Sequence, residues 1–193
     1  MESNSNHFED PAEVRWFAIR VEYRGEMAVK RYLDAKGIEH FLPMQYREVV
    51  AGRRKVRKLV PSVHNLIFIR TTKQQIDRIK STTAYPIRYM MQRDGSRSHP
   101  IVVPDREMLD FIRVAGTFDD RLLYLADTDV RPREGDRVRI LSGPFAGVTG
   151  IYMRVKGTRC RRVVVEVPGI AAVATASLPP SMIEVIESSA QLR

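Results

Sequence analysis

The sequence of 193 residues contains one cysteine, Cys160, and lacks any apolar run near the ~20 residues needed to span a bilayer. A single cysteine excludes an intramolecular disulfide and any metal site built from several cysteines, and it fits a reducing compartment. The four histidines have no metal-ligand spacing, and the acidic residues form no catalytic pattern. We therefore expect a soluble, cytoplasmic, monomeric protein without membrane segment, metal, cofactor or enzymatic activity.

Acidic residues are also in the minority. Asp and Glu number 23 against 32 Lys and Arg, which gives a net charge of +9 and a pI of about 10.0. Such an excess favours contact with nucleic acid or another polyanionic surface, since cations that neutralise phosphates release counterions. A basic protein that binds no polyanion has the same composition, so charge alone leaves both possibilities open.

The first half of the chain alternates between strand-like and helical apolar patterns. Met1–Glu13 is polar and predicts a flexible tail over 1–13. The strands are expected at Trp16–Val21, Ile38–Tyr46, Val63–Ile69 and Ile87–Met91, and the helices at Arg24–Lys36, Thr72–Lys80 and Pro104–Ala115. The order predicts an α+β N-terminal domain over 14–116, with an antiparallel sheet and flanking helices.

A strongly basic segment interrupts this pattern. Its six cations surround Ala51-Gly52 and are Arg47, Arg53, Arg54, Lys55, Arg57 and Lys58. Two β-capable arms around a short turn with glycine predict a projecting hairpin.

From residue 117 onward the chain changes character. Residues 117–131 have weak periodicity and predict a linker that carries one apolar island, Leu122–Leu125. Five short strand patterns follow, at Asp136–Leu141, Val148–Val155, Arg162–Val167, Ala171–Ala176 and Ile183–Ile186. They predict a small all-β barrel over 132–187, closed so that few strand edges stay exposed, and a tail over 188–193.

The start of this barrel carries a motif. Val138 and Ile140 alternate with Arg137 and Arg139, and a turn with the sequence Gly-Pro-Phe-Ala-Gly follows, with Phe145 at its centre. Gly150 predicts a bulge or a close backbone approach. The segment 134–151 resembles the KOW motif of SH3-like barrels, which occurs in ribosomal proteins too and so does not define a function. It lacks the Lys-Ser/Thr of a phosphate-binding loop, which argues against nucleotide binding.

The N-terminal half carries a second resemblance. Trp16 opens the first strand, the first helix ends at Gly37, and Phe41-Leu42-Pro43, the basic hairpin and Pro61–Ile69 follow. In this order the segments resemble the N-terminal domain of the NusG family of transcription elongation and antitermination factors. The two resemblances together cover residues 14–187.

The third strand departs from the family pattern. Members usually have Pro-Gly-Tyr or Pro-Asn-Tyr where this chain has His64-Asn65-Leu66. The departure favours a specialised paralogue over the housekeeping NusG. The closest likeness is to the UpxY-type factors of Bacteroides, which implies action on polysaccharide operons.

The resemblance implies a mechanism based on binding. In the family, an apolar patch of the N-terminal domain docks on the clamp helices of RNA polymerase and suppresses pausing or termination. The residues that match this patch are Trp16, Phe17, Ile19, Leu66 and Phe68. For each of them, plain sheet core is the competing interpretation.

Two further contacts are implied in the same way. The hairpin residues Arg53, Arg54, Lys55, Arg57 and Lys58 match a region that could contact non-template DNA or nascent RNA, and a solvated loop is the alternative. Phe145 matches the barrel-tip aromatic that engages a ribosomal protein or a termination factor, and a barrel plug is the alternative.

Three other hypotheses remain at this point. The barrel and the charge also suit a ribosome-associated, RNA-binding KOW protein, and the two-domain match also suits the housekeeping NusG. Refolding of the barrel into helix is conceivable because Ala171–Leu178 is rich in alanine. The target operon and any recruiting sequence element are not encoded in a recognisable motif.

Overall fold

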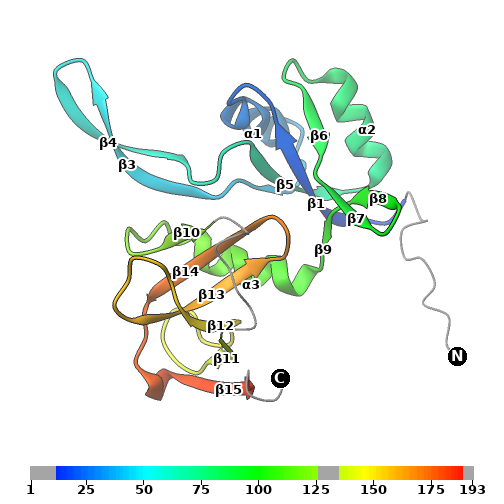
Figure 1. Cartoon of the computed structure of the whole chain (residues 1–193). Coiled ribbons are helices and arrows are strands. Elements are labelled where there is room, and N and C mark those ends of the chain that lie inside the picture. Colours follow the sequence, from blue (N-terminus) through cyan, green and yellow to red (C-terminus); the bar gives the residue numbers. More distant parts are fainter. Residues whose placement is uncertain (1–11, 126–134, 189–193) are drawn as a thin grey trace, which may run out of the picture. The chain divides into compact units, whose positions relative to one another are not determined.

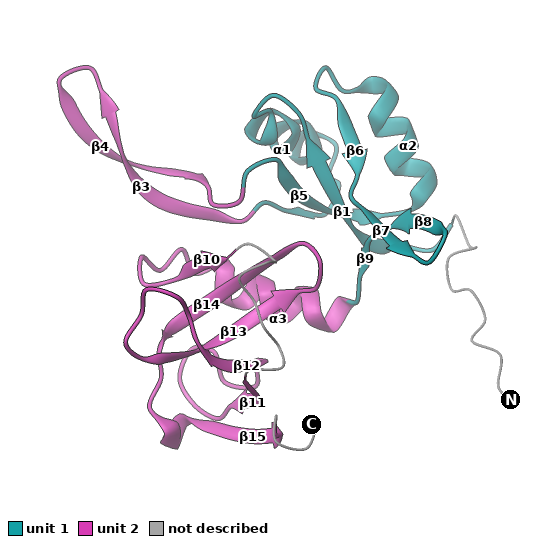
Figure 2. Ribbon diagram, viewed as in Figure 1, with its two compact units in different colours: residues 1–42, 64–104 teal, residues 43–63, 105–193 magenta. Residues whose placement is uncertain are grey.

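The structure is a computed structural model that describes residues 12–125 and 135–188. Residues 1–11 of the predicted tail 1–13, residues 189–193 of the predicted tail 188–193, and residues 126–131 of the predicted linker lie outside the described residues. The chain divides into two compact units, one of residues 1–42 with 64–104 and one of residues 43–63 with 105–193 (Figure 2). The predicted domains, 14–116 and 132–187, are continuous ranges whose bounds differ from those of these two units. They stay a prediction.

The first unit is built on an antiparallel sheet with the strand order β2-β5-β1-β6, to which β9 adds by pairing with β1 (Figure 1). The strands are β1 Arg15–Val21, β2 His40–Phe41, β5 Leu66–Thr71, β6 Ile87–Tyr89 and β9 Val102–Val103. The helices are α1 Glu26–Ala35 and α2 Lys73–Thr82. The α+β class is confirmed, with both predicted helices in place.

Local sequence explains where these helices begin and end. Gly37 has φ +62°, and the N–H groups of Gly37 and Ile38 donate to Asp34 O and Leu33 O, at 3.1 and 3.0 Å. This is the Schellman arrangement that glycine permits after a helix. Thr72 caps α2, since its Oγ1 accepts from Gln75 N at 3.2 Å.

The strand predicted at Ile87–Met91 is divided in two. Met90 donates through its N–H to Ala18 O at 2.9 Å, and its carbonyl accepts from Ile101 N at 2.8 Å. Beyond it, β7 Met91–Asp94 and β8 Arg97–Pro100 form a hairpin around Gly95, which has φ +57°. The Asp94-Gly95 turn is confirmed, whereas the exposed, polar arms gave no strand pattern in the sequence.

The second unit contains the basic hairpin, one helix and a six-stranded sheet (Figure 1). The hairpin consists of β3 Met44–Ala51 and β4 Arg54–Pro61, and the helix is α3 Asp105–Ala115. The sheet has the order β10-β14-β13-β12-β11-β15. Its strands are β10 Leu123–Leu125, β11 Asp136–Ile140, β12 Thr149–Arg154, β13 Arg161–Val167, β14 Ala171–Ser177 and β15 Ile183–Glu187, with the 3-10 helix η3 Pro180–Met182 before the last. All five strands predicted after residue 131 are confirmed.

Strand β10 was not predicted, because its residues fall in the segment assigned to the linker. It pairs antiparallel with β14, with Tyr124 opposite Val173. Leu123 and Leu125 pack against a cluster of buried side chains comprising Ile151, Met153, Val155, Val164, Ala172 and Ala174. The apolar island is therefore an edge strand of the β-rich sheet.

The predicted close approach at Gly150 is also confirmed. A Cβ at this position would lie 2.5 Å from Val164 O and 2.8 Å from Val163 Cγ1. Strands β12 and β13 can pair here only because residue 150 has no side chain.

Candidate functional site

The five apolar residues of the predicted polymerase patch lie on β1 and β5, but on two different faces of the sheet. Side chains alternate along a strand, and directly opposite residues share a face. Ala18 is opposite Phe68 and Arg20 is opposite Leu66, so Trp16, Leu66 and Phe68 share one face. Phe17 and Ile19 point to the other.

Helix α2 covers the face of Phe17 and Ile19. The Phe17 ring meets the Tyr89 ring edge-on, with centroids 5.7 Å apart. The Tyr89 hydroxyl donates to α2, where it lies 3.2 Å from Asp77 Oδ1 and 3.3 Å from Lys73 O. Burial, together with the Asp77 carboxylate, raises the pKa of Tyr89. Phe17 and Ile19 thus belong to a helix-covered core.

The face of Trp16, Leu66 and Phe68 is buried as well. These side chains are 3%, 2% and 0% exposed, against 5% for Phe17 and 0% for Ile19. In this conformation no partner reaches any of the five directly. Contact between them and RNA polymerase stays a prediction, and it requires that the face becomes uncovered.

The tripeptide His64-Asn65-Leu66, which departs from the family pattern, has a structural role in this chain. Asn65 has φ +60°, a left-handed conformation that asparagine tolerates better than most residues. Its N–H donates to Oε1 of the buried Glu26 at 2.7 Å. His64 is exposed, while Leu66 turns into the sheet.

The basic hairpin forms as predicted. Its register runs from Met44 opposite Pro61 to Ala51 opposite Arg54, which leaves Gly52 and Arg53 as a two-residue turn. Gly52 has φ +64°, so glycine occupies the first turn position, as a II′ hairpin requires. Residues 51–58 are all exposed.

The cations of the hairpin separate onto its two faces. Glu48 is opposite Arg57 and Val50 is opposite Lys55, so Lys55 and Arg57 share one face, here called the acidic-paired face. Arg47 is opposite Lys58 and Ala51 is opposite Arg54, so Arg47, Arg54 and Lys58 share the other, here called the open face.

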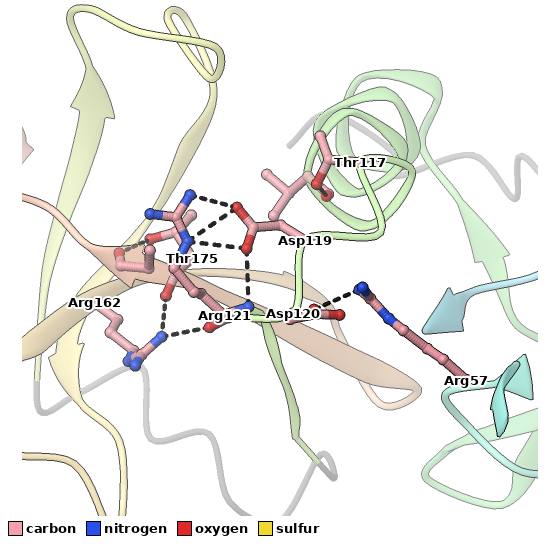
Figure 3. Close-up of polar contacts among 9 residues, drawn as sticks. Arg57, Thr117, Asp119, Asp120, Arg121, Arg162 and Thr175 are labelled. Carbon is pink, nitrogen blue, oxygen red and sulfur yellow. Dashed lines mark hydrogen bonds and ion pairs between the residues drawn. The ribbon is translucent and has the colours of Figure 1, made fainter. Parts of the chain in front are cut away.

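Partners hold the cations of the acidic-paired face. Arg57 Nη2 lies 2.5 Å from Asp120 Oδ2 (Figure 3). The Arg57 guanidinium also lies over the Tyr46 ring, 4.4 Å from its centroid. Lys55 Nζ lies 3.4 Å from Glu48 Oε2. The two cations of this face therefore meet two carboxylates.

A polar network fixes the loop that supplies Asp120. The Asp119 carboxylate accepts from Arg121 Nη2 at 2.6 Å and from Arg121 N at 2.9 Å (Figure 3). Arg162 Nη1 donates to Arg121 O at 2.8 Å and to Thr175 O at 2.6 Å. A pocket of about 360 Å³ lies beside the network and is lined by Gln45, Tyr46, Arg47, Glu48, Arg57, Asp119, Asp120 and Leu122.

The titration of Asp119 tests this network. Hydrogen bonds from the side chain and then the backbone N–H of Arg121 hold the Asp119 pKa at about 2, below its ordinary 3.8. A lowered pKa favours the ionised form in the fold, so its stabilisation is present above pH 3.8 and is lost as the pH falls towards 2. An NMR titration should give a midpoint near 2. Arg121→Ala should raise the Asp119 midpoint part of the way towards 3.8, because the backbone N–H of residue 121 still donates. An unchanged midpoint would disprove the contact between the Arg121 side chain and Asp119.

Tyr124 joins the base of the hairpin to the end of α3. Its hydroxyl donates towards Met44 O at 3.1 Å and Ala115 O at 3.3 Å. Burial raises the pKa of Tyr124. The sequence gave no indication of this anchor, because Tyr124 lies in the predicted linker.

Phe145 is 7% exposed, so its side chain is buried in this conformation. Its turn is closed by Gly147 N donating to Ile140 O at 2.7 Å, with Gly147 at φ +87°. Arg113 Nη2 on α3 donates to Ala146 O at 2.8 Å. Contact between Phe145 and a ribosomal protein or termination factor stays a prediction.

A second α3 residue, Asp110, binds the strand after this turn. Its Oδ2 accepts from Thr149 N at 3.1 Å and from Thr149 Oγ1 at 3.0 Å. Neither Asp110 nor Arg113 stands out in the amino-acid sequence. Both are charged residues on an amphipathic helix, and no local pattern connects them with partners more than thirty positions away.

Within residues 12–125 and 135–188 no group of three or more His, Cys, Asp or Glu side chains is placed to hold a metal ion. Cys160 is exposed. In the same described ranges, no helix has the length and apolarity to cross a membrane.

The chain thus combines an α+β unit built on an antiparallel sheet with a second unit that contains the basic hairpin and a β-rich sheet. The model of one family, described as transcription termination factor nusG, matches residues 14–112, a little over half of the chain. The chain belongs to the NusG family. Members of this family regulate transcription elongation and antitermination and interact with RNA polymerase.

Among solved structures, the chain is similar to NusG of Thermotoga maritima, in a structure titled for the interaction of its domains. The identity is 20% and the TM-score 0.44, and the match covers 92% of this chain and 100% of the other. No curated protein matches the chain.

Proposed function

We propose that the chain is a transcription elongation and antitermination factor that binds the clamp of RNA polymerase and suppresses pausing or termination. The family match over residues 14–112 supports this proposal most directly. That segment contains strands β1 and β5 and the complete basic hairpin. The activity is one of binding, in which the factor changes how polymerase moves.

We further propose a specialised paralogue of the UpxY type that acts on polysaccharide operons. The support is His64-Asn65-Leu66, which replaces the family's usual third-strand tripeptide. Leu66 has no aromatic ring and is 2% exposed, so this position offers no aromatic anchor to a partner. A specialised paralogue is expected to bind polymerase through an altered surface. Leu66, one of the departing residues, belongs to the predicted polymerase patch.

The proposed surfaces have different roles. Trp16, Leu66 and Phe68 form a polymerase-contact face that opens on binding, while Phe17 and Ile19 support it from the core. The hairpin contacts nucleic acid near the transcription bubble. The turn of Phe145 serves a ribosomal protein or a termination factor.

Binding of the full chain to core RNA polymerase, followed by a pausing assay in vitro, tests the function. We expect the protein to be retained by immobilised polymerase and to shorten pauses. Failure to bind polymerase, or pauses of unchanged length, would refute the proposal. Co-sedimentation with ribosomal subunits in the absence of polymerase would instead favour a ribosome-associated KOW protein.

Gene position tests the specialisation separately. A place at the head of a long polysaccharide operon is expected for a specialist. A place among general transcription and translation genes would indicate the housekeeping factor.

A further inference from the structure

The two faces of the β3–β4 hairpin differ in net charge, although each carries cations at similar density. On the acidic-paired face, Lys55 meets Glu48 and Arg57 meets Asp120. Two positive and two negative charges leave that face close to neutral. Arg57 also covers the ring of Tyr46, so the hairpin's aromatic side chain is not an open stacking surface.

Among the described residues the open face has no such ion pairs, although Arg47 lines the same pocket as Asp119 and Asp120. In the described part of the chain, no carboxylate forms an ion pair with Arg47, Arg54 or Lys58, and all three are exposed. Arg47 donates to the side-chain amide oxygen of Gln45 at 2.7 and 2.9 Å, in the amide orientation that its surroundings favour. That partner is neutral and orients the guanidinium without cancelling its charge.

The positions of these cations suit an extended polyanion. Arg47 and Lys58 form one cross-strand pair, and Arg54 lies four residues further towards the turn. At roughly 3.3 Å per residue this separation is about 13 Å, which reaches across several phosphates of a backbone. Guanidinium and ammonium groups bind phosphate oxygens as strong charge-assisted donors.

The remaining side chains of the open face indicate which nucleic acid it takes. Gln45, Val49, Ala51, Val56 and Val60 complete the face, and none is aromatic. Proteins that hold single strands normally pair cations with aromatic rings on which bases stack. A cationic face without rings suits the phosphates of a duplex, where the bases are already stacked.

We propose that the open face, formed by Arg47, Arg54 and Lys58, binds the phosphate backbone of duplex DNA without reading its sequence. Lys55 and Arg57 on the acidic-paired face do not take part. The inference rests on the proposed function, because it assigns this duplex to the DNA beside transcribing polymerase. It goes further by naming the binding face and by excluding two of the five cations first considered.

Two double variants of the full chain separate the faces. Arg54→Gln with Lys58→Gln alters the open face, and Lys55→Gln with Arg57→Gln alters the acidic-paired face. Each pair removes one arginine and one lysine from β4, so both variants have the same net charge. All four side chains are exposed, and circular dichroism with thermal unfolding establishes that both variants keep the native fold.

Fluorescence anisotropy with a labelled DNA duplex, over a series of salt concentrations, gives the comparison. For the open-face variant we expect affinity to fall about tenfold or more and the slope of log K against log salt to flatten by about 2, near 0.9 per lost phosphate contact. For the acidic-paired variant we expect a change below about threefold and a slope unchanged within about 0.5. Equal losses in both variants would show an effect of net charge only and would overturn the proposal.

The same assay with a single strand and with duplex RNA checks the assigned ligand. Tighter binding of either one than of duplex DNA would overturn the assignment. Retention on immobilised polymerase, measured with the same proteins, keeps the two proposals apart. A chain that binds polymerase but no duplex refutes only this inference, and one that binds duplex through the open face but no polymerase refutes only the proposed function.

Discussion

Replacing Phe68 with alanine should lower the free energy of unfolding by about 3–5 kcal/mol. The ring is fully buried on β5, which lies between β1 and β2 in the sheet. Its removal takes apolar surface out of the core and leaves a cavity that a sheet, tied by its hydrogen bonds, cannot readily close. Chemical denaturation followed by circular dichroism measures the change.

Leu109→Ala is the matched surface control. Leu109 is 57% exposed on α3, and alanine is a good helix former, so the change should stay within about 0.5 kcal/mol. Should Phe68→Ala cost no more than this control, the ring would be accessible in solution. That result would favour the interpretation of Phe68 as a polymerase contact over its interpretation as part of the sheet core.

The stability of these variants also decides how polymerase-binding experiments are interpreted. Loss of polymerase binding by a Phe68 or Trp16 variant can arise from loss of the fold. It supports a direct contact only where the circular dichroism spectrum and the unfolding midpoint stay native.

Gly150→Ala should destabilise the protein by about 2–3 kcal/mol through overpacking. The new Cβ would lie 2.5 Å from the carbonyl oxygen of Val164, and neither backbone can move away without breaking the β12–β13 ladder. Denaturation measures the cost. Hydrogen exchange locates it, and we expect faster exchange for amides of β12 and β13.

Gly157→Ala separates steric overlap from backbone strain. Gly157 has φ +81° and nothing within 4 Å of a Cβ, so the substitution should cost about 1 kcal/mol from its left-handed conformation alone. Equal costs at the two positions, or unchanged exchange in β12 and β13 of Gly150→Ala, would contradict the close approach.

Local sequence determines most of the fold. Three local patterns predict conformation without reference to distant residues. They are the apolar runs of β1 and β5, the glycine after α1 and the alternation of residue types in β11, and these elements form where the sequence predicts them. The exceptions depend on distant partners. Strand β10 forms by pairing with β14, in which Tyr124 lies opposite Val173, about fifty positions along the chain. Strand β8 is an arm without an apolar face.

The candidate site was less accessible to sequence reasoning. The family resemblance placed the predicted patch on β1 and β5, yet it could not show that Phe17 and Trp16 point to opposite faces or that both are buried. The basic segment was visible as a run of charge. Its division into two unlike faces depends on Asp120, which is 63 positions from Arg57.

Strand β10 also determines where the C-terminal part of this protein can be cut. A fragment that begins at residue 132, just before the KOW motif, would lack β10 and leave the backbone edge of β14 without its partner. It would also remove the cover that Leu123 and Leu125 give to the Ile151–Met153 side of the core. An open, apolar edge of this kind recruits other chains and promotes aggregation. A C-terminal fragment therefore has to include β10, and the contacts of Arg113 with Ala146 and of Asp110 with Thr149 favour a start before α3.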